Sequence, residues 1–541
     1  MRTKVVLFFI IILASFLRLW QLTSLPPGFS ADEATIGYNA YAILKTGADE
    51  YGTKVPLAFK AFSDYQAPFY TYLTVPFVKF LGLNELAVRL PSAIFGILTV
   101  VIVYLLVLRL FGFQLLALLS AFFAAISPYL IFFSRGAWQA NLATFFITLG
   151  FYFFVVGLEN SKYLPFSVLA FIASLYSYQS PRLLVPIIGV FLILFYWKKL
   201  WTQKRAILVS FILGLLFFAP IIFILSGTAG QARFKGVSIF SDPGPVNRIN
   251  QLRGEHSNPN GFLSKVLHNK IQTFAIITIR NHLEHFDKDF LFFKGDPVGR
   301  QNVPEMGVTY LFDIILLPLG LIFVFRRGLL DKAKIILLWL AVAPMASAFT
   351  FQTPNALRAA NMAVPLVIVS SLGAFWLFEV ISKRNMLAKI FCFLLIGSIL
   401  GFSVGKFLHQ YFVHLPKQYG LEWESGFGKM INFVKENEDN YQKIIITNRY
   451  DQPYILTLFY LKYDPKTYQK VDKQESQIDN FGFTMISSFD KYEFRRINWQ
   501  EDSKLKDVLL VGTAEEIPKN APVEKEILFP NGQPAFKIVS T

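Results

Sequence analysis

Two adjacent acidic residues, Asp32 and Glu33, are the side chains of this 541-residue chain best suited to chemistry. They follow a membrane-length apolar stretch and a turn-forming Pro-Pro-Gly run at 26–28. Charged groups at a membrane surface are costly to hold there and are therefore functional candidates. The pair also opens an amphipathic helix predicted over 34–44, lying along the bilayer. A local role is thus the alternative, with Asp32 as helix N-cap and Glu33 as a first-turn charge.

Three arginines at the ends of apolar stretches form the second group of candidates: Arg135, Arg182 and Arg358. Each stands in a short loop with Pro, Tyr or Trp, and Tyr178 lies beside Arg182. Side chains that snorkel to the interface would explain one such arginine easily, but three less so. A guanidinium matches a phosphate group in shape, and one charge-assisted contact contributes about 1.5–3 kcal/mol. We therefore expect these four residues to bind the phosphate of a donor.

A carboxylate and several arginines are sufficient for glycosyl transfer from a lipid phosphate. The carboxylate can act as base for an acceptor hydroxyl. A glycosidase also needs a general acid, but a phosphate leaves as a stable anion that arginines can stabilise. The sequence has no Gly-rich strand–turn–helix motif for a nucleotide. The donor is therefore expected to be a lipid-linked sugar.

The composition places the chain among polytopic membrane proteins. Hydrophobic residues make up 54% of the chain and charged residues only 16%. The net charge of +16 comes from basic clusters in short loops between apolar spans, which indicates membrane topology and not nucleic-acid binding. The single cysteine, Cys392, excludes an internal disulfide and a cysteine-based metal site. The N-terminus resembles a signal peptide, but we interpret it as an uncleaved first helix.

About eleven membrane spans are expected from the apolar stretches, because a spanning helix needs roughly 20 apolar residues. With a cytoplasmic N-terminus, every dense basic cluster falls on the cytoplasmic side, as the positive-inside rule requires. Residues 66–82 are broken by prolines and are expected to be interfacial or re-entrant. The expected spans are 5–21, 88–110, 113–130, 140–158, 164–180, 182–198, 206–225, 308–326, 333–350, 359–380 and 387–407.

The expected fold is therefore an α-helical polytopic membrane domain over 1–407 followed by a small extracytoplasmic α/β domain over 408–541. Two large outer loops, 22–87 and 226–307, belong to the membrane domain. In the second domain, short apolar runs predict buried strands. These runs are 443–447, 508–512 and 535–539, and a helix is expected over 453–461.

A group of histidines and acids in the second outer loop has two interpretations. His282 and His285, with Glu284 and Asp287, have a spacing that permits a metal site. A hydrated loop with interspersed charges is the commoner case, so no divalent metal is expected. His285 and Asp296 remain candidates for contacts with the donor headgroup or the acceptor.

Several segments together resemble the GT-C glycosyltransferases. They are the acidic pair, residues 84–92, Ser134-Arg135 after Ser127-Pro128, and the stretches 285–296 and 354–358. The resemblance covers about residues 1–400. Within the GT-C enzymes, the segments resemble most specifically the group of protein O-mannosyltransferases and aminoarabinose transferases (glycosyltransferase family 39 and its relatives), and among these the bacterial members. It implies inverting transfer from a polyprenyl-phosphate sugar, with Asp32 as base supported by Glu33. The short chain and loops resemble bacterial relatives, which implies a location in the bacterial plasma membrane, and the topology places the expected active face outside the cytoplasm.

Two positions depart from the family pattern. Gln139 stands where relatives often have an acid after the arginine that corresponds to Arg135. Ala67 precedes Pro68 where aminoarabinose transferases carry a lysine, which makes lipid A modification a less favoured function. The sugar and the acceptor, whether protein, lipid or glycan, stay open.

Two other functions are the alternatives to a glycosyltransferase. A transporter or flippase of lipid-linked sugars predicts charges within the spans and an internal repeat, and the sequence has neither. A ligase or polymerase of lipid-linked sugars would share the outer arginines but does not require the acidic helix start.

Overall fold

The computed structural model describes residues 2–62, 64–227, 236–475 and 485–541. The chain forms two compact units. Unit 1 consists of 1–14, 96–133 and 140–405, and unit 2 consists of 15–95, 134–139 and 406–541. Unit 2 therefore combines the first expected outer loop with the C-terminal part of the chain. The predicted domain boundary at 407/408 stays a prediction.

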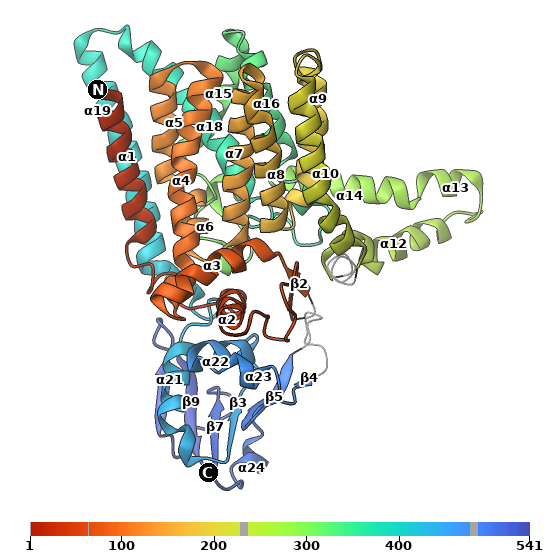
Figure 1. The fold of residues 1–541 in the computed structure, drawn as a ribbon, viewed down its shortest axis with the longest axis vertical. Coiled ribbons are helices and arrows are strands. Elements are labelled where there is room, and N and C mark those ends of the chain that lie inside the picture. The colour runs from red at the N-terminus through yellow and green to blue at the C-terminus, as the bar shows by residue number, and fades with distance from the viewer. Residues whose placement is uncertain (1, 63, 228–235, 476–484) are drawn as a thin grey trace. The chain divides into compact units, whose positions relative to one another are not determined.

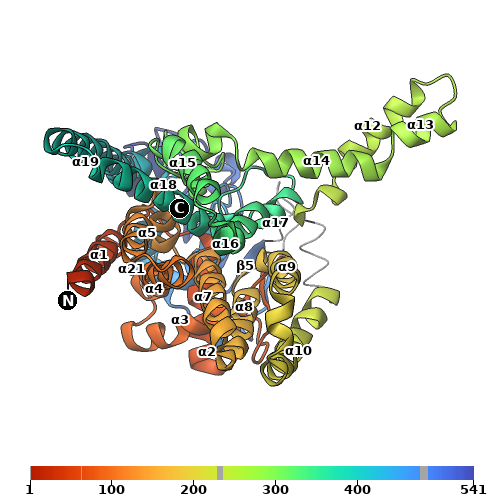
Figure 2. The same ribbon diagram turned by 90° about the horizontal axis from the view of Figure 1, so that it is seen from above.

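Unit 1 is built of long helices that lie side by side (Figures 1 and 2). Helices α15 and α18 approach closely because each carries a glycine at the contact. A Cβ at Gly320 would lie 2.0 Å from the Val369 carbonyl oxygen, and a Cβ at Gly373 would lie 2.2 Å from that of Leu316. The helices that contribute to this unit are α1 (Arg2–Leu19), α4 (Glu85–Phe111), α5 (Gln114–Ile126), α6 (Pro128–Arg135), α7 (Gln139–Glu159), α8 (Leu164–Ser177), α9 (Pro181–Trp201), α10 (Lys204–Ser226), α12 (Pro243–Gly254), α13 (Phe262–Leu267), α14 (Lys270–Glu284), α15 (Asp313–Arg326), α16 (Leu330–Val342), α17 (Met345–Ala348), α18 (Ala363–Ser382) and α19 (Met386–His409).

Among the described residues, six helices are long and apolar enough to cross a membrane, or seven if the bent pair α5 and α6 is one span. The bend between these two helices is 51°. Helices α8, α15 and α16 cover expected spans but contain only 14, 14 and 13 residues. The protein is therefore a polytopic membrane protein, and the count of eleven stays a prediction.

Unit 2 contains the predicted α/β fold at its C-terminal end. A seven-stranded sheet has the order β4-β5-β6-β3-β7-β9-β8, in which β3 is parallel to both neighbours and the other pairs are antiparallel (Figure 1). The predicted strands and the helix over 453–461 are all present. The strands are β3 (Lys443–Ile446), β4 (Gln474–Glu475), β5 (Ile486–Phe489), β6 (Tyr492–Phe494), β7 (Val508–Gly512), β8 (Lys525–Leu528) and β9 (Pro534–Ser540), and the helices are α20 (Leu415–Tyr419), α21 (Phe427–Asn437), α22 (Pro453–Leu461), α23 (Pro465–Tyr468) and α24 (Trp499–Asp502).

One glutamate closes the edge of this sheet where ligands commonly bind. In open α/β sheets, ligands bind beyond the carboxyl ends of the parallel strands. Here the Glu516 carboxylate accepts hydrogen bonds from Thr447 Oγ1 (2.9 Å), Ile497 N (3.2 Å) and Thr513 N (2.8 Å), which follow β3, β6 and β7. This edge is therefore filled by the protein's own side chain.

The first part of unit 2 consists of the end of α1 (Arg2–Leu19), α2 (Ala31–Thr46), the hairpin β1 (Phe59–Ala61) and β2 (Asp64–Gln66), α3 (Pro68–Leu81) and the start of α4. Helix α2 begins with a capping box, in which Ser30 is the N-cap and Glu33 bonds back to it. The alternative that Asp32 is the N-cap is therefore wrong. Asp32 is the second residue of the helix, after the N-cap.

Helix α2 is more buried than its amphipathic pattern suggests. We expected it to lie along the bilayer, but both its apolar and its polar residues are largely buried. Helix α22 packs against it: the rings of Phe29 and Phe459 are 4.5 Å apart, and Tyr38 Oη donates to the Tyr463 carbonyl (3.2 Å). The C-terminal part of the chain therefore holds the helix that carries Asp32, which a local pattern cannot reveal.

Replacing Gly37 by leucine is expected to loosen this packing. A Cβ at Gly37 would already lie 2.6 Å from the Phe459 ring and 2.7 Å from the Val88 side chain. Overpacking of this kind destabilises proteins by about 1–3 kcal/mol. Thermal unfolding of the purified protein measures the loss. Gly189→Leu is the control, because nothing lies within 4 Å of a Cβ there, and equal stability of the two variants would contradict the packing described.

Candidate active site

Asp32 is held at the start of α2 with its carboxylate half-buried. Its Oδ1 accepts a hydrogen bond from Nε2 of Gln66, the last residue of β2 (3.0 Å). Gln139, which replaces the acid of the family pattern, donates to the carbonyl of Ala67 (3.0 Å). Both amides therefore fix the chain around Asp32. A half-buried carboxylate with one oxygen oriented by an amide can accept a proton from a hydroxyl.

Glu33 has a different environment from its neighbour. Arg89 donates to both of its carboxylate oxygens, from Nε to Oε1 and from Nη2 to Oε2, each at 2.9 Å. Backbone N–H groups of Ala137 (2.9 Å) and Ser30 (3.2 Å) donate to the same two oxygens. Glu33 is only 4% exposed. Four donors thus engage it, and its geometry is that of a residue that joins α2, α4 and the 134–139 segment.

Arg89 supports the site but was not among the candidate site residues predicted from the sequence. Its side chain is fully buried, and besides Glu33 it contacts the carbonyls of Leu22 (3.3 Å), Pro26 (3.2 Å) and Gly28. It therefore fixes the turn that leads into α2. The available signal was an arginine at the first turn of the expected span 88–110, because a charge at that place requires a partner.

Arg135 does not have the environment expected of a phosphate-binding residue. It is fully buried, and its guanidinium donates to Tyr411 Oη (3.1 Å) and to the carbonyls of Leu17 (2.9 Å), Trp20 (2.6 Å) and Leu25 (3.2 Å). Four of its five N–H groups are thus used within unit 2. The geometry speaks against the predicted phosphate contact and gives Arg135 a structural role.

Arg358 and Tyr178, both expected at the donor phosphate, are brought together in unit 1. They line one small cavity, together with residues of α7. Both side chains are half-buried. Arg358 Nη1 donates to Thr350 Oγ1 (2.9 Å), and Nη2 lies 3.4 Å from Gln352 Oε1. Unlike Arg135, this guanidinium is accessible.

Arg182 is the second residue of α9 and is also half-buried. Its Nε donates to the carbonyl of Leu175 (3.2 Å) and its Nη1 to Oε1 of Gln179. These contacts orient the side chain from within its own helix–loop–helix segment. Arg182 does not line the cavity that Tyr178 and Arg358 share.

His285 holds the loop that carries Arg358. The N–H of Asn355 donates to His285 Nε2 (3.1 Å), so the ring proton is on Nδ1, which faces the Asn281 carbonyl (2.9 Å). Burial lowers the pKa of His285 to about 4, which keeps the ring neutral. The side chain is fully buried. A direct headgroup or acceptor contact, as we expected, therefore does not fit, and His285 positions the 353–358 loop.

Asp296 binds the next residue of the same loop. Its Oδ1 accepts from Val298 N (2.8 Å), and its Oδ2 accepts from the N–H of Ala356. Tyr129 Oη donates to the Ala356 carbonyl (2.8 Å). Asp296 is 2% exposed, so it too supports the loop rather than reaching a substrate. The 285–296 and 354–358 motifs are thus two halves of one structural element.

The possible metal site at His282, His285, Glu284 and Asp287 does not form. Within the ranges that the structure describes, no three His, Cys, Asp or Glu side chains are grouped to hold a metal ion. Glu284 instead accepts a hydrogen bond from Thr353 Oγ1 (2.8 Å). It is therefore a further contact to the Arg358 loop.

Donor binding is expected to weaken as the pH falls through about 6. Burial raises the pKa of Asp296 from 3.8 to about 6, although the N–H groups of Val298 and Ala356 and then the charge of Arg358 partly offset this. Protonation places a hydroxyl where two N–H groups need acceptors, so the loop should loosen in acid. Stability changes in the opposite direction, because the folded state binds more protons than the unfolded state between the two pKa values. The free energy of unfolding should therefore fall by roughly 3 kcal/mol as the pH rises from about 4 to 6.

Binding of undecaprenyl phosphate and thermal unfolding, both followed between pH 4 and 7, measure these opposed trends. Asp296→Asn is the control. Its amide lacks the titrating proton, so the variant should bind weakly at every pH in this range. A wild-type profile that is flat through pH 6 would contradict the role given to Asp296.

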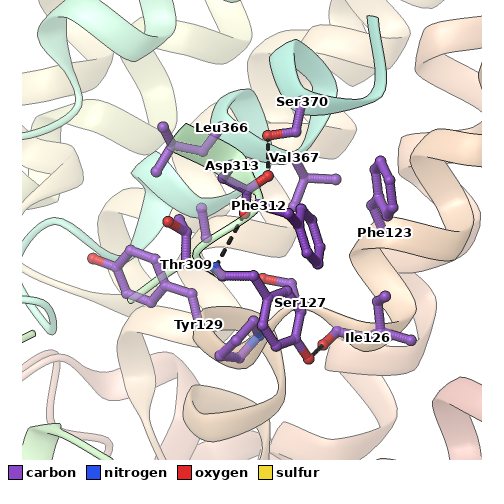
Figure 3. A pocket seen from close by; sticks show the side chains of 13 residues that line it. Phe123, Ile126, Ser127, Tyr129, Thr309, Phe312, Asp313, Leu366, Val367 and Ser370 are labelled. Carbon is purple, nitrogen blue, oxygen red and sulfur yellow. Dashed lines mark hydrogen bonds between the residues drawn. The ribbon is translucent and has the colours of Figure 1, made fainter. Parts of the chain in front are cut away.

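A second buried carboxylate in unit 1, Asp313, lines a cavity at the break between α5 and α6 (Figure 3). Its Oδ1 accepts from Ser370 Oγ (2.6 Å) and its Oδ2 from Tyr310 N (3.1 Å). The cavity has a volume of about 20 Å³, which is room for about one water molecule. Asp313 therefore joins the Tyr310 backbone at the start of α15 to Ser370 of α18.

Comparison with known proteins shows which family and which solved structures the chain resembles. Residues 65–224 match the family described as dolichyl-phosphate-mannose-protein mannosyltransferase. None of the curated proteins compared with the chain matches it. ArnT from Cupriavidus metallidurans in the apo state is 12% identical, with a TM-score of 0.55, over 99% of this chain and 97% of that one. The same protein bound to undecaprenyl phosphate is 11% identical, covers the same shares and has a TM-score of 0.53.

The archaeal oligosaccharyltransferase AglB from Archaeoglobus fulgidus, in complex with an inhibitory peptide and a dolichol-phosphate, is also similar. It is 13% identical, with a TM-score of 0.54, over 85% of this chain. The chain spans 63% of that protein's length. The family match supports the expected enzyme class, a glycosyltransferase. The structural matches confirm the expected architecture: this chain is a membrane protein with the GT-C glycosyltransferase fold.

Proposed function

We propose that the protein transfers a sugar from a polyprenyl-phosphate donor to an acceptor hydroxyl on the extracytoplasmic side of a bacterial plasma membrane, with inversion. The observation that carries the proposal is the contrast between the two adjacent carboxylates. Glu33 is buried and engaged by four donors, whereas Asp32 is half-buried and its Oδ1 accepts a hydrogen bond from the Gln66 amide. Of the two carboxylates, Asp32 is the more exposed, as a base that meets an incoming hydroxyl must be.

In this proposal, Asp32 removes the proton of the acceptor hydroxyl as its oxygen attacks the anomeric carbon. The bond from that carbon to the lipid phosphate breaks in the same step, which inverts the configuration. The leaving phosphate carries the developing charge and needs no general acid. The acceptor can be a protein, a lipid or a glycan, because its hydroxyl is the only group that the chemistry requires.

The donor phosphate is assigned to Arg358, with Tyr178 and Arg182 as further contacts. Arg358 is accessible and stands on a loop whose backbone is held by His285 and Asp296. Preorganised donors of this kind stabilise charge that develops in the transition state. Arg135 and Glu33 have no direct part in the reaction.

The proposed reaction does not use a divalent metal. Metal ions of this kind prefer carboxylate, carbonyl and water oxygens. One partner of the Asp32 carboxylate is the Gln66 amide, which donates its N–H group, and Gln139 stands in place of a second acid. These residues do not fit a metal centre, so activity should survive treatment with a chelator.

Arg358→Ala is expected to weaken binding of a polyprenyl phosphate by about ten- to a hundredfold, because a charge-assisted hydrogen bond contributes about 1.5–3 kcal/mol. Binding of undecaprenyl phosphate to the purified protein measures this, and a panel of polyprenyl-phosphate sugars then tests transfer. Arg326→Ala, an arginine at the other end of α15 from Asp313, is the control. Unchanged binding by Arg358→Ala would remove this residue from the donor site. Movement of intact donor across vesicles without transfer would favour a flippase.

A further inference from the structure

A helical arm leaves the body of unit 1 between its long helices. This lateral arm consists of α12, α13 and α14 and projects sideways, across the direction of the spanning helices of the same unit (Figures 1 and 2). Its tip is tied by two contacts: Arg253 Nε donates to the His268 carbonyl (2.6 Å), and the rings of His256 and His268 approach to 3.0 Å between their Nε2 atoms. The arm is therefore an ordered hairpin of helices.

One face of α14 is apolar and exposed. Ile271 is 85% exposed, and Ile276, Ile279 and Leu283 are each about 60% exposed. The opposite face packs on unit 1 through Asn281, whose amide donates to two backbone carbonyls. Helix α13 adds further exposed apolar side chains: Phe262, Leu263, Val266 and Leu267. Exposed apolar side chains gathered on two successive helices indicate an interaction site.

A lipid surface is the partner that the surroundings indicate. The arm follows α10, a span of mean hydropathy 2.9 that is only 17% buried and therefore faces lipid along most of its length. Residues 243–284 contain five Lys or Arg and two Glu, an excess of three positive charges. An apolar face flanked by basic residues is typical of helices that lie in the membrane interface, and anionic lipids attract such helices.

We infer that α13 and α14 lie in the bilayer interface, on the side of the membrane where α10 ends, with the apolar face of α14 against anionic lipid. Such helices bury their apolar face about 5–10 Å into the headgroup and acyl boundary. Helix α14 ends beside His285, which holds the Arg358 loop. If Arg358 binds the donor phosphate as proposed above, the arm sets that loop at the depth of the lipid headgroups.

Site-specific fluorescence tests this inference without any assay of activity. In a Cys392→Ser background, Ile279→Cys places a bimane label on the apolar face, and Asn250→Cys places it on the exposed polar side of α12 as the matched control. Leu283→Cys replaces the first variant if it does not fold. Each full-length protein is reconstituted as a single copy in nanodiscs with brominated anionic lipids, and iodide serves as the aqueous quencher.

We expect the label at 279 to be quenched by brominated lipid and protected from iodide, and the label at 250 to show the reverse. Replacing anionic by zwitterionic lipid should reduce the protection at 279. Equal access of iodide to both labels would overturn the inference. Protection at 279 that is seen in densely loaded vesicles but lost in single-copy nanodiscs would also overturn it, because a second copy of the chain would then be the partner.

Discussion

Replacing Asp32 by asparagine is expected to lower turnover by about 10²–10⁴-fold, the usual contribution of a positioned general base. The asparagine can still accept the hydrogen bond from Gln66 that orients the native carboxylate. It cannot accept a proton from the acceptor hydroxyl. Folding and binding of undecaprenyl phosphate should therefore stay close to those of the wild type. Transfer of sugar from a polyprenyl-phosphate donor, measured with purified protein, gives the rate.

The neighbouring variant Glu33→Gln provides the matched control, because it makes the same chemical change one residue away. It should lower stability, since Arg89 would lose its charged partner. Near-wild-type turnover by Asp32→Asn would eliminate Asp32 as the base. A loss of stability in Asp32→Asn equal to that of Glu33→Gln would instead give both carboxylates a structural role.

Much of the fold could be predicted because its signals are local. Apolar stretches of membrane length and alternating strand patterns depend on neighbouring residues alone, so the membrane class and the strands of the α/β fold were predicted correctly. Helix α2 was found but its environment was not. Its amphipathic pattern indicated a bilayer surface, whereas α22, more than 400 residues later, covers it. Only long-range packing contains that information.

The three candidate arginines also show that local sequence does not reveal the environment of a side chain. Arg135, Arg182 and Arg358 have similar local sequence contexts, and each was expected to bind phosphate. The buried Arg135 guanidinium donates its hydrogen bonds to backbone carbonyls and to Tyr411, while Arg358 stays accessible. A guanidinium that matches phosphate matches carbonyl oxygens equally well. Residue type and position therefore identify candidates, and burial distinguishes the structural arginine from the accessible ones.

The ion pair between Glu33 and Arg89 is expected to carry the largest effect on stability. Removing one partner of a buried pair leaves an uncompensated charge and destabilises a protein by about 3–5 kcal/mol. Both side chains are at most 5% exposed, and Arg89 also holds the turn before α2. Glu33→Gln and Arg89→Met should each show this loss in thermal or denaturant unfolding of the purified protein.

The double variant decides whether the pair acts as a unit. Because neither charge is then left alone, its loss should be clearly smaller than the sum of the two single losses. The exposed pair Arg109–Glu159 is the control, since both of its side chains are more than 40% exposed and such pairs contribute about 0.2–1 kcal/mol. Additive losses at Glu33 and Arg89 would mean that each acts through its backbone contacts. Glu33 would then stabilise the protein only through the capping box with Ser30 and the hydrogen bond from Ala137 N.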